Sequence, residues 1–253
     1  FGLQCGSVRA ESTRMDREPP HTIRVVVADD HDLTRAEIAS LLDHSEGISI
    51  VGEAANGAEA IHVTLATHAD VVLLDVLMPV LDGVAATRQL LQAHDRSTLA
   101  GGTAPRPAVV MLTDRGADEY VYESLRDGAR GFVSKNARPA ELALAVRTAA
   151  DDSRLLWPAE TVRLIASLTP DRGGRPDIAR ARSGLSTGDA IVVVGVGRGD
   201  DDEQIARNLG IGVDEVQRRI RSLLLMLALR DRTQLVVFAY ESGLLTPKGV
   251  RAP

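Results

Sequence analysis

The 253-residue chain has one cysteine, Cys5, which excludes an internal disulfide and fits a reducing cytoplasm. Aromatic residues make up only 3% of the sequence, so its cores must be built from aliphatic side chains. No apolar run approaches the roughly 18 residues that a membrane span requires, so no membrane contact is expected. Positive charge is not in excess either. The net charge of −6 argues against a protein that coats nucleic acid, although a small local DNA-reading element remains compatible with it.

The first part of the chain has no hydrophobic periodicity. We expect residues 1–20 to form a disordered N-terminal extension. Residues 1–14 could derive from an expression tag, with Met15 as the natural start.

From Ile23 to about residue 150, apolar β-branched runs alternate with amphipathic helical patterns. Strands are expected at Ile23–Ala28, Ser49–Ala54, Val71–Leu74, Ala108–Leu112 and Gly131–Ser134. Helices are expected at Leu33–Leu42, Gly57–Ala66, Gly83–Gln92, Asp118–Asp127 and Pro139–Ala149. Such repeats predict an α/β domain over residues 21–150, with a five-stranded, doubly wound parallel sheet of the flavodoxin-like kind.

Two stretches interrupt these patterns. Ala100–Pro107 is rich in glycine and proline, and we interpret it as a tolerated surface insertion on the side away from any site. Residues 151–183 are expected to be a linker that holds a helix at about 157–168 and a flexible segment over Thr169–Ser183.

Only helical patterns follow, which predicts a small all-α domain over residues 184–253. Its helices are expected at Thr187–Val196, Asp202–Leu209, Val213–Leu227 and Arg232–Ser242. Gly210 suits the tight corner of a helix–turn–helix.

Polar residues stand at the carboxyl ends of several expected strands. Asp29 and Asp30 follow the first strand, Asp75 ends the third, Thr113 follows the fourth and Lys135 follows the fifth. Carboxyl ends of parallel strands meet at one crevice, so these side chains should converge. Carboxylates, a hydroxyl and an ammonium suit a divalent cation and a phosphoryl group, with one carboxylate free to act as nucleophile.

These residues also carry a resemblance to a known family. The motifs that carry it are Asp29-Asp30, Asp75 with Met78-Pro79, Asp82-Gly83, Leu112-Thr113 and the run Gly128–Lys135. In this order they resemble the receiver domain of bacterial two-component response regulators, which accept a phosphoryl group from a sensor histidine kinase.

The resemblance implies a role for each residue of the site. Asp75 would be the phospho-acceptor, with Lys135 paired to the phosphate and Thr113 donating a hydrogen bond to it. Mg²⁺ would be held by Asp30 and Asp75 directly, by Asp29 through water and by the backbone carbonyl of Leu77. Phe132 would be the switch aromatic of the family, or simply a packed strand residue.

The helical end of the chain resembles the LuxR-type helix–turn–helix of the NarL/FixJ subfamily. The segments that carry this resemblance are Leu185-Ser186, Gln204–Leu209, Val216, Ile220, Leu229–Leu235 and Ala239–Leu244. It implies DNA contacts from Gln217, Arg218, Arg219 and Arg221. Acidic residues at Asp200–Glu203 and a neutral overall charge of residues 184–253 do not favour binding to a polyanion.

We therefore expect a cytoplasmic transcriptional response regulator that is not an enzyme, binds promoter DNA and forms a homodimer on activation. Leu235, Val236, Phe238 and Ala239 fit a dimer face or a core equally well. One alternative is an atypical regulator whose DNA binding is independent of phosphorylation or controlled by a ligand. Another is an effector domain that binds a protein partner. A metal-dependent phosphohydrolase would need a second acid soon after Asp75, and Val76 and Leu77 offer none.

Overall fold

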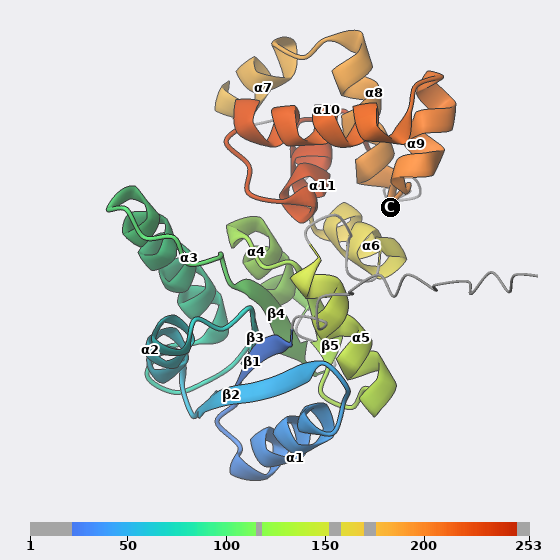
Figure 1. Cartoon of the computed structure of the whole chain (residues 1–253). Helices are drawn as coiled ribbons and strands as arrows, with labels where there is room; N and C mark the ends of the chain where they lie inside the picture. The colour runs from blue at the N-terminus through green and yellow to red at the C-terminus, as the bar shows by residue number, and fades with distance from the viewer. Residues whose placement is uncertain (1–21, 115–117, 152–157, 170–175, 247–253) are drawn as a thin grey trace, which may run out of the picture.

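The computed structural model describes residues 22–114, 118–151, 158–169 and 176–246 (Figure 1). The expected N-terminal extension, residues 1–20, lies outside these ranges, as do residues 152–157 and 170–175 of the expected linker. Among the described residues, no helix has the length and apolar character needed to cross a membrane.

A parallel sheet of five strands forms the centre of the first part of the chain. The strands are β1 (Ile23–Ala28), β2 (Ile48–Ala54), β3 (Val71–Asp75), β4 (Ala108–Thr113) and β5 (Gly131–Ser134). Their order in the sheet is β2-β1-β3-β4-β5, and every neighbouring pair is parallel. The predicted fold class is thereby confirmed, and β3 lies in the middle of the sheet.

Both faces of this sheet are covered by helices, which explains why its strands read as continuous apolar runs. The helices are α1 (Asp32–Asp43), α2 (Gly57–Thr67), α3 (Gly83–Leu99), α4 (Asp118–Asp127) and α5 (Pro139–Ala150). Val25 and Val27 of β1 pack with residues of α1 and α5 on one face. Val26 and Ala28 point the other way, into the apolar cluster with α2, α3 and α4. We call residues 22–151 the α/β part.

The second part of the chain, residues 158–246, is helical, and we call it the helical part. Its helices are α6 (Pro158–Leu168), α7 (Pro176–Ser183), α8 (Thr187–Arg198), α9 (Asp202–Leu209), α10 (Val213–Met226) and α11 (Arg232–Glu241). Gly210, with φ of 66°, ends α9 in the left-handed region and forms the expected corner before α10.

Two expectations about helices are wrong in part. Helix α7 occupies a stretch that we expected to be a flexible linker. Pro176 suits the first position of a helix, and Arg182 anchors its end by donating from Nη1 to the carbonyl of Ser242 at 3.0 Å. Helix α3 extends beyond Gln92 to Leu99. The following loop folds back on it, since Nε2 of His94 donates to the carbonyl of Ala104 at 3.0 Å.

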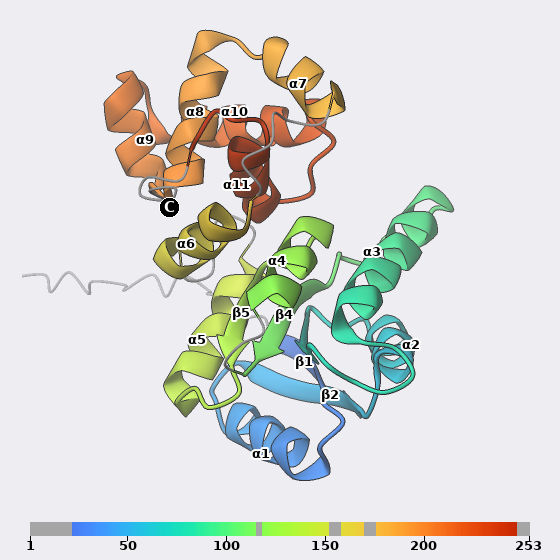
Figure 2. The same cartoon turned by 180° about the vertical axis from the view of Figure 1, so that it is seen from behind.

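Helix α11 is the element of the helical part that packs against the α/β part: it contacts α8 and α6 of its own part and α4 of the α/β part (Figures 1 and 2). Its apolar side chains belong to the same cluster as those of α2, α3 and α4, so the core continues from one part into the other. Leu235, Val236, Phe238 and Ala239, which we considered for a dimer face, are all buried inside this one chain.

Polar contacts surround this apolar contact. Arg230 donates from Nη1 to the carbonyl of Asp127 at 3.0 Å, and Thr233 donates from Oγ1 to the carbonyl of Arg130 at 3.0 Å. Gly128, at φ of 113°, makes room for Arg230, because a Cβ atom there would lie 3.3 Å from Nη1 of that arginine.

The Gly/Pro-rich insertion takes part in the same contact and is not a passive surface loop. Nε of Arg106 lies 3.6 Å from Oδ1 of Asp95, and Nη2 of Arg230 lies 3.2 Å from Oδ2 of the same carboxylate. Asp95 therefore bridges an arginine of the insertion and an arginine of the helical part. The loop does lie at the amino end of β4, away from the strand ends that carry the polar residues.

Asp95→Asn is expected to loosen the contact between the two parts, because Arg106 and Arg230 would then be neighbouring cations without a shared anion. The pairs are partly exposed, so the cost is about 1 kcal/mol. Amide hydrogen exchange in α11 and α4 should become roughly fivefold faster. Glu37→Gln, which removes an exposed carboxylate of α1, should leave these rates unchanged. Equal rates in the wild type and in Asp95→Asn would contradict the bridging role.

Candidate functional site

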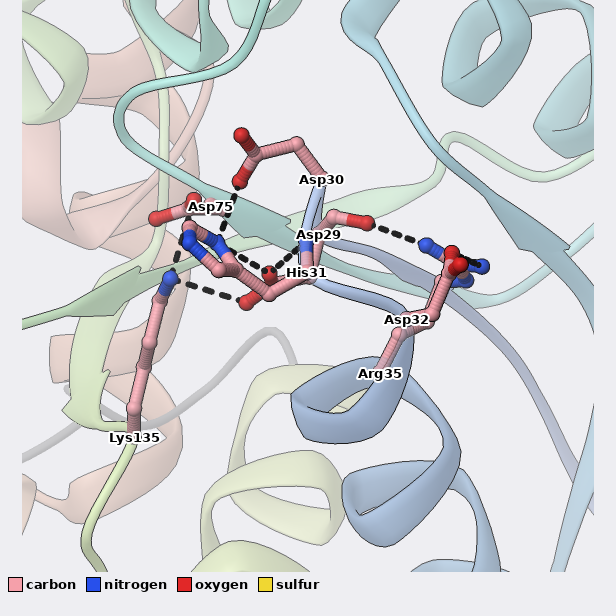
Figure 3. Close-up of polar contacts among 7 residues, drawn as sticks. All are labelled: Asp29, Asp30, His31, Asp32, Arg35, Asp75 and Lys135. Atoms are coloured by element: carbon pink, nitrogen blue, oxygen red, sulfur yellow. Dashed lines mark hydrogen bonds and ion pairs between the residues drawn. The ribbon is translucent and has the colours of Figure 1, made fainter.

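Three elements bring charged side chains to the carboxyl edge of the sheet (Figure 3). Asp29 follows β1 directly, Asp75 is the last residue of β3, and Lys135 follows β5 directly. Nζ of Lys135 lies 2.8 Å from Oδ2 of Asp29 and 2.9 Å from Oδ2 of Asp75. One ammonium thus links two carboxylates from different strands.

These groups are largely withdrawn from water, since Asp29 has an exposed fraction of 0% and Asp75 of 5%. Burial raises the pKa of the Asp75 carboxyl, and the hydrogen bond from Lys135 only partly opposes this. Burial alone would lower the pKa of Lys135, but the close contacts of its ammonium with the carboxylates of Asp29 and Asp75 outweigh this and raise that pKa. Lys135 therefore remains a cation at neutral pH.

We call Asp29, Asp75 and Lys135 the triad. Asp30 lies beside the triad and contacts His31, which was not among the predicted site residues. Nδ1 of His31 is 2.7 Å from Oδ1 of Asp30 and 3.6 Å from Oδ1 of Asp29. Ligand atoms of Asp29, Asp30 and His31 all lie within 4.8 Å of one another. The signal that could have identified His31 is its position immediately after the acidic pair.

Carboxylate oxygens of Asp29 and Asp30 fit a hard divalent cation such as Mg²⁺. The nitrogen of His31 is a softer ligand, of the kind that transition metals use.

The loop between β3 and α3 shapes the region around Asp75. Asp82 does not reach the charged groups but caps α3, because its Oδ1 accepts from the backbone N–H of Ala85 at 2.7 Å. A Cβ atom at position 83 would lie 2.1 Å from the carbonyl oxygen of Asp75, so only glycine allows α3 to begin there. Val80 has φ of 67°, a left-handed conformation that is costly for a β-branched side chain.

Three other predicted residues lie near the site without joining the charged groups. Thr113 donates from Oγ1 to the carbonyl of Asp114 at 2.8 Å. Phe132 is half-buried against the apolar cluster on the α2–α4 face. Leu77 has an exposed side chain, with a fraction of 60%. The structure therefore brings together Asp29, Asp30, Asp75 and Lys135, and leaves the hydroxyl of Thr113 turned to its own neighbour.

The candidate DNA contacts all lie on α10. Nη2 of Arg218 is 2.7 Å from Oε2 of Glu215, and Nε of Arg219 is 3.0 Å from Oε1 of the same carboxylate. Arg221 is exposed and forms no ion pair with any other described residue, and Gln217 is half-buried. Two of the three arginines are thus already paired within the chain.

Two acids before and within α9 have structural roles. Oδ1 of Asp201 accepts from the backbone N–H of Gln204 at 2.7 Å, which caps α9. Oδ1 of Asp202 lies 2.5 Å from Nη1 of Arg232, and both side chains are largely buried. These two carboxylates hold α9 in place, so part of the repulsion that we expected toward DNA is offset inside the helical part.

Comparison with known proteins agrees with this geometry. Residues 25–147 match the response regulator receiver domain family. The chain belongs to the response regulator family. This response regulator is similar to the transcriptional regulatory protein LiaR of Bacillus subtilis, with 26% identity over 88% of the chain and 99% of LiaR. It is also similar to the response regulator protein VraR of Staphylococcus aureus, with 29% identity over 88% of the chain and 99% of VraR.

The chain is also similar to a solved structure. It is the signal receiver domain of NarL from Mycobacterium tuberculosis, with 33% identity over 52% of this chain and 98% of that one, and a TM-score of 0.45. Response regulators are signalling proteins rather than enzymes, as we expected for this chain.

Lys135→Met is expected to destabilise the protein by about 3 kcal/mol at neutral pH, because it leaves two buried carboxylates without their cation. The folded-state pKa of Asp75 already lies above its ordinary value, and it should rise further in the variant. A carboxyl group of this kind loses stabilising free energy as pH rises through its folded-state pKa. The difference in unfolding free energy between variant and wild type should therefore shrink as pH falls.

Urea unfolding at several pH values measures this difference. Arg207→Met is the control, because it removes an exposed cation of α9, away from these carboxylates. It should change stability little at any pH. A Lys135→Met variant as stable as the wild type at neutral pH would show that the triad does not need its ammonium.

Proposed function

We propose that this response regulator accepts a phosphoryl group on Asp75 from a sensor histidine kinase and acts in the cytoplasm as a DNA-binding transcriptional regulator. The position of Asp75 is the observation that supports phosphorylation at this residue. It is the nearly buried carboxylate at the end of the middle strand, with its Oδ2 2.9 Å from the ammonium of Lys135 and two further carboxylates beside it.

The chemistry requires each of these groups. A carboxylate oxygen of Asp75 forms the new O–P bond while the P–N bond of the donor phosphohistidine breaks, and the imidazole leaves with a proton. Lys135 then exchanges its ion pair with the Asp75 carboxylate for one with the phosphoryl oxygens. Thr113 would turn its hydroxyl from Asp114 toward the phosphate. Phe132 would follow as the switch aromatic.

Magnesium fits the donor set of this site, because it uses carboxylates together with the oxygens of a substrate phosphate. Asp30 and Asp75 would hold the ion directly, Asp29 through water and Leu77 by its carbonyl. When bound, it supplies positive charge that offsets the repulsion between the carboxylates and the incoming phosphoryl group.

Acetyl phosphate with Mg²⁺ should add a single phosphoryl group to the full chain, detected by intact-mass spectrometry. Asp75→Asn should abolish the addition, because the amide is a poor nucleophile. Chelation of the metal should abolish it as well. Asp82→Asn is the matched control: this acid caps α3 and does not contact the triad, so labelling should persist. Equal labelling of Asp75→Asn and the wild type would refute Asp75 as the acceptor.

DNA binding by the helical part is supported by the corner at Gly210 between α9 and α10, and by similarity over most of the chain to LiaR, which is named a transcriptional regulatory protein. We assign the DNA contacts to Gln217, Arg218, Arg219 and Arg221 of α10. The homodimer expected on activation is part of this proposal. If it used the apolar side chains of α11, these would first have to leave their present packing.

A protein partner in place of DNA is the second candidate. It is favoured by one observation, the pairing of Arg218 and Arg219 with Glu215, which leaves little free positive charge on α10. Phosphorylation-independent or ligand-controlled DNA binding has less support, because Asp29, Asp30, Asp75 and Lys135 are all in place.

Arg221→Ala should weaken binding to the bound genomic fragments by about 1–3 kcal/mol if this arginine contacts a base. Gel shifts with fragmented genomic DNA at low salt measure the effect, with the protein phosphorylated and unphosphorylated. Arg180→Ala, an equal loss of charge at an exposed position of α7, should have little effect. If the wild type shifts no fragment in either state, the proposal that the helical part binds a protein partner is favoured.

A further inference from the structure

We propose that Glu215, by pairing with Arg218 and Arg219 of α10, acts as a competitor of DNA phosphates for these two arginines and so weakens binding to DNA of unrelated sequence. This inference rests on the proposed DNA binding of the helical part and identifies the residue that limits it.

The geometry places one carboxylate between two guanidinium groups. Glu215 reaches Nη2 of Arg218 with one oxygen at 2.7 Å and Nε of Arg219 with the other at 3.0 Å. The residues are spaced by three and four positions, so all three side chains lie on neighbouring positions of the helix surface. A phosphate group would offer these arginines the same kind of charge-assisted contact, so the carboxylate and a phosphate compete for them.

The two arginines are not equally free to exchange partners. Arg219 is packed against α8: its Nη1 lies where a Cβ atom at Gly188 would come within 2.5 Å, and 4.0 Å from Oδ1 of Asp189. The side chain of Arg218 has an exposed fraction of 65%, and Glu215 is its only ion-pair partner among the described residues. Arg218 is therefore the side chain that can move from Glu215 to a phosphate.

Such an exchange weakens binding in two ways. Arg218 must give up its ion pair, and the carboxylate that it leaves then lies close to the polyanion. Non-specific binding depends almost wholly on phosphate neutralisation, whereas specific binding also uses base contacts. The penalty from Glu215 thus reduces a larger share of non-specific affinity and raises the preference for a specific site.

Glu215→Gln tests this in the full chain, because glutamine keeps the shape of the side chain and can still accept a hydrogen bond from Arg219. The probe is a fluorescein-labelled DNA duplex of mixed sequence, titrated by fluorescence anisotropy over a series of salt concentrations. We expect Kd to fall about fivefold. The slope of log Kobs against log salt should become steeper by about 0.9, the value for one more phosphate contact.

Glu203→Gln is the matched control, since it removes one exposed carboxylate from the same helical part without releasing an arginine. Its effect measures the general gain from losing a negative charge. The second test is Arg218→Ala, alone and combined with Glu215→Gln. Arg218 is exposed, so this change should not affect folding, which thermal melting of every variant verifies. The gain from Glu215→Gln should vanish when Arg218 is absent.

The outcomes separate this inference from the function on which it rests. If the wild type binds the duplex and Glu215→Gln gains no more than Glu203→Gln, or keeps its gain without Arg218, Glu215 is not a competitor and DNA binding stands. If no variant binds at the lowest salt, both proposals fall. A gain that depends on Arg218, together with the steeper salt slope, supports the competitor.

Discussion

The ammonium of Lys135 is the group on which the charged edge of the sheet depends. Parallel strands deliver Asp29 and Asp75 to neighbouring positions, because β1 and β3 are adjacent in the sheet. Two largely buried carboxylates so close together would repel each other or take up a proton. The strand order leaves β4 between β5 and β3, so the long side chain of lysine is what allows a cation from β5 to reach both carboxylates.

A second set of interactions determines how the two parts of the chain lie together. Apolar side chains of α11 continue the core of the α2–α4 face, and polar groups around them contact backbone carbonyls at the end of α4. Glu241 at the far end of α11 lies 3.4 Å from the hydroxyl of Tyr122 and 3.6 Å from Nε of Arg126. The helical part is therefore held along the whole length of α11, on the face of the α/β part that includes α4.

The sequence was sufficient for the sheet and for the charged site. Strands buried on both faces read as uninterrupted apolar runs, and parallel topology then requires the residues after them to converge. Patterns of this kind cannot predict side-chain rotamers, so the hydrogen bond from Thr113 to Asp114 could not be foreseen. Contacts between distant segments are equally hidden. The partners Asp95 and Arg230 are 135 residues apart, and no local signal connects them.

Other differences between the expected and the observed structure had local signals in the sequence. The proline that begins α7 is a favourable first helical residue, although the surrounding glycines and arginines suggested a linker. Glu215 precedes Arg218 and Arg219 at the spacings that favour ion pairs on a helix, so this pairing was available from the sequence. The role of Asp202 was not, because its partner Arg232 belongs to another helix.

The packing of α11 also has a consequence for how the molecule unfolds. Because α11 packs its apolar side chains against both parts within one continuous core, melting of either part exposes apolar surface of the other. The helical part then derives some of its resistance to heat and denaturant from the α/β part, and the reverse holds as well. The two parts differ in architecture, but through α11 they form one cooperative unit as long as they remain in contact.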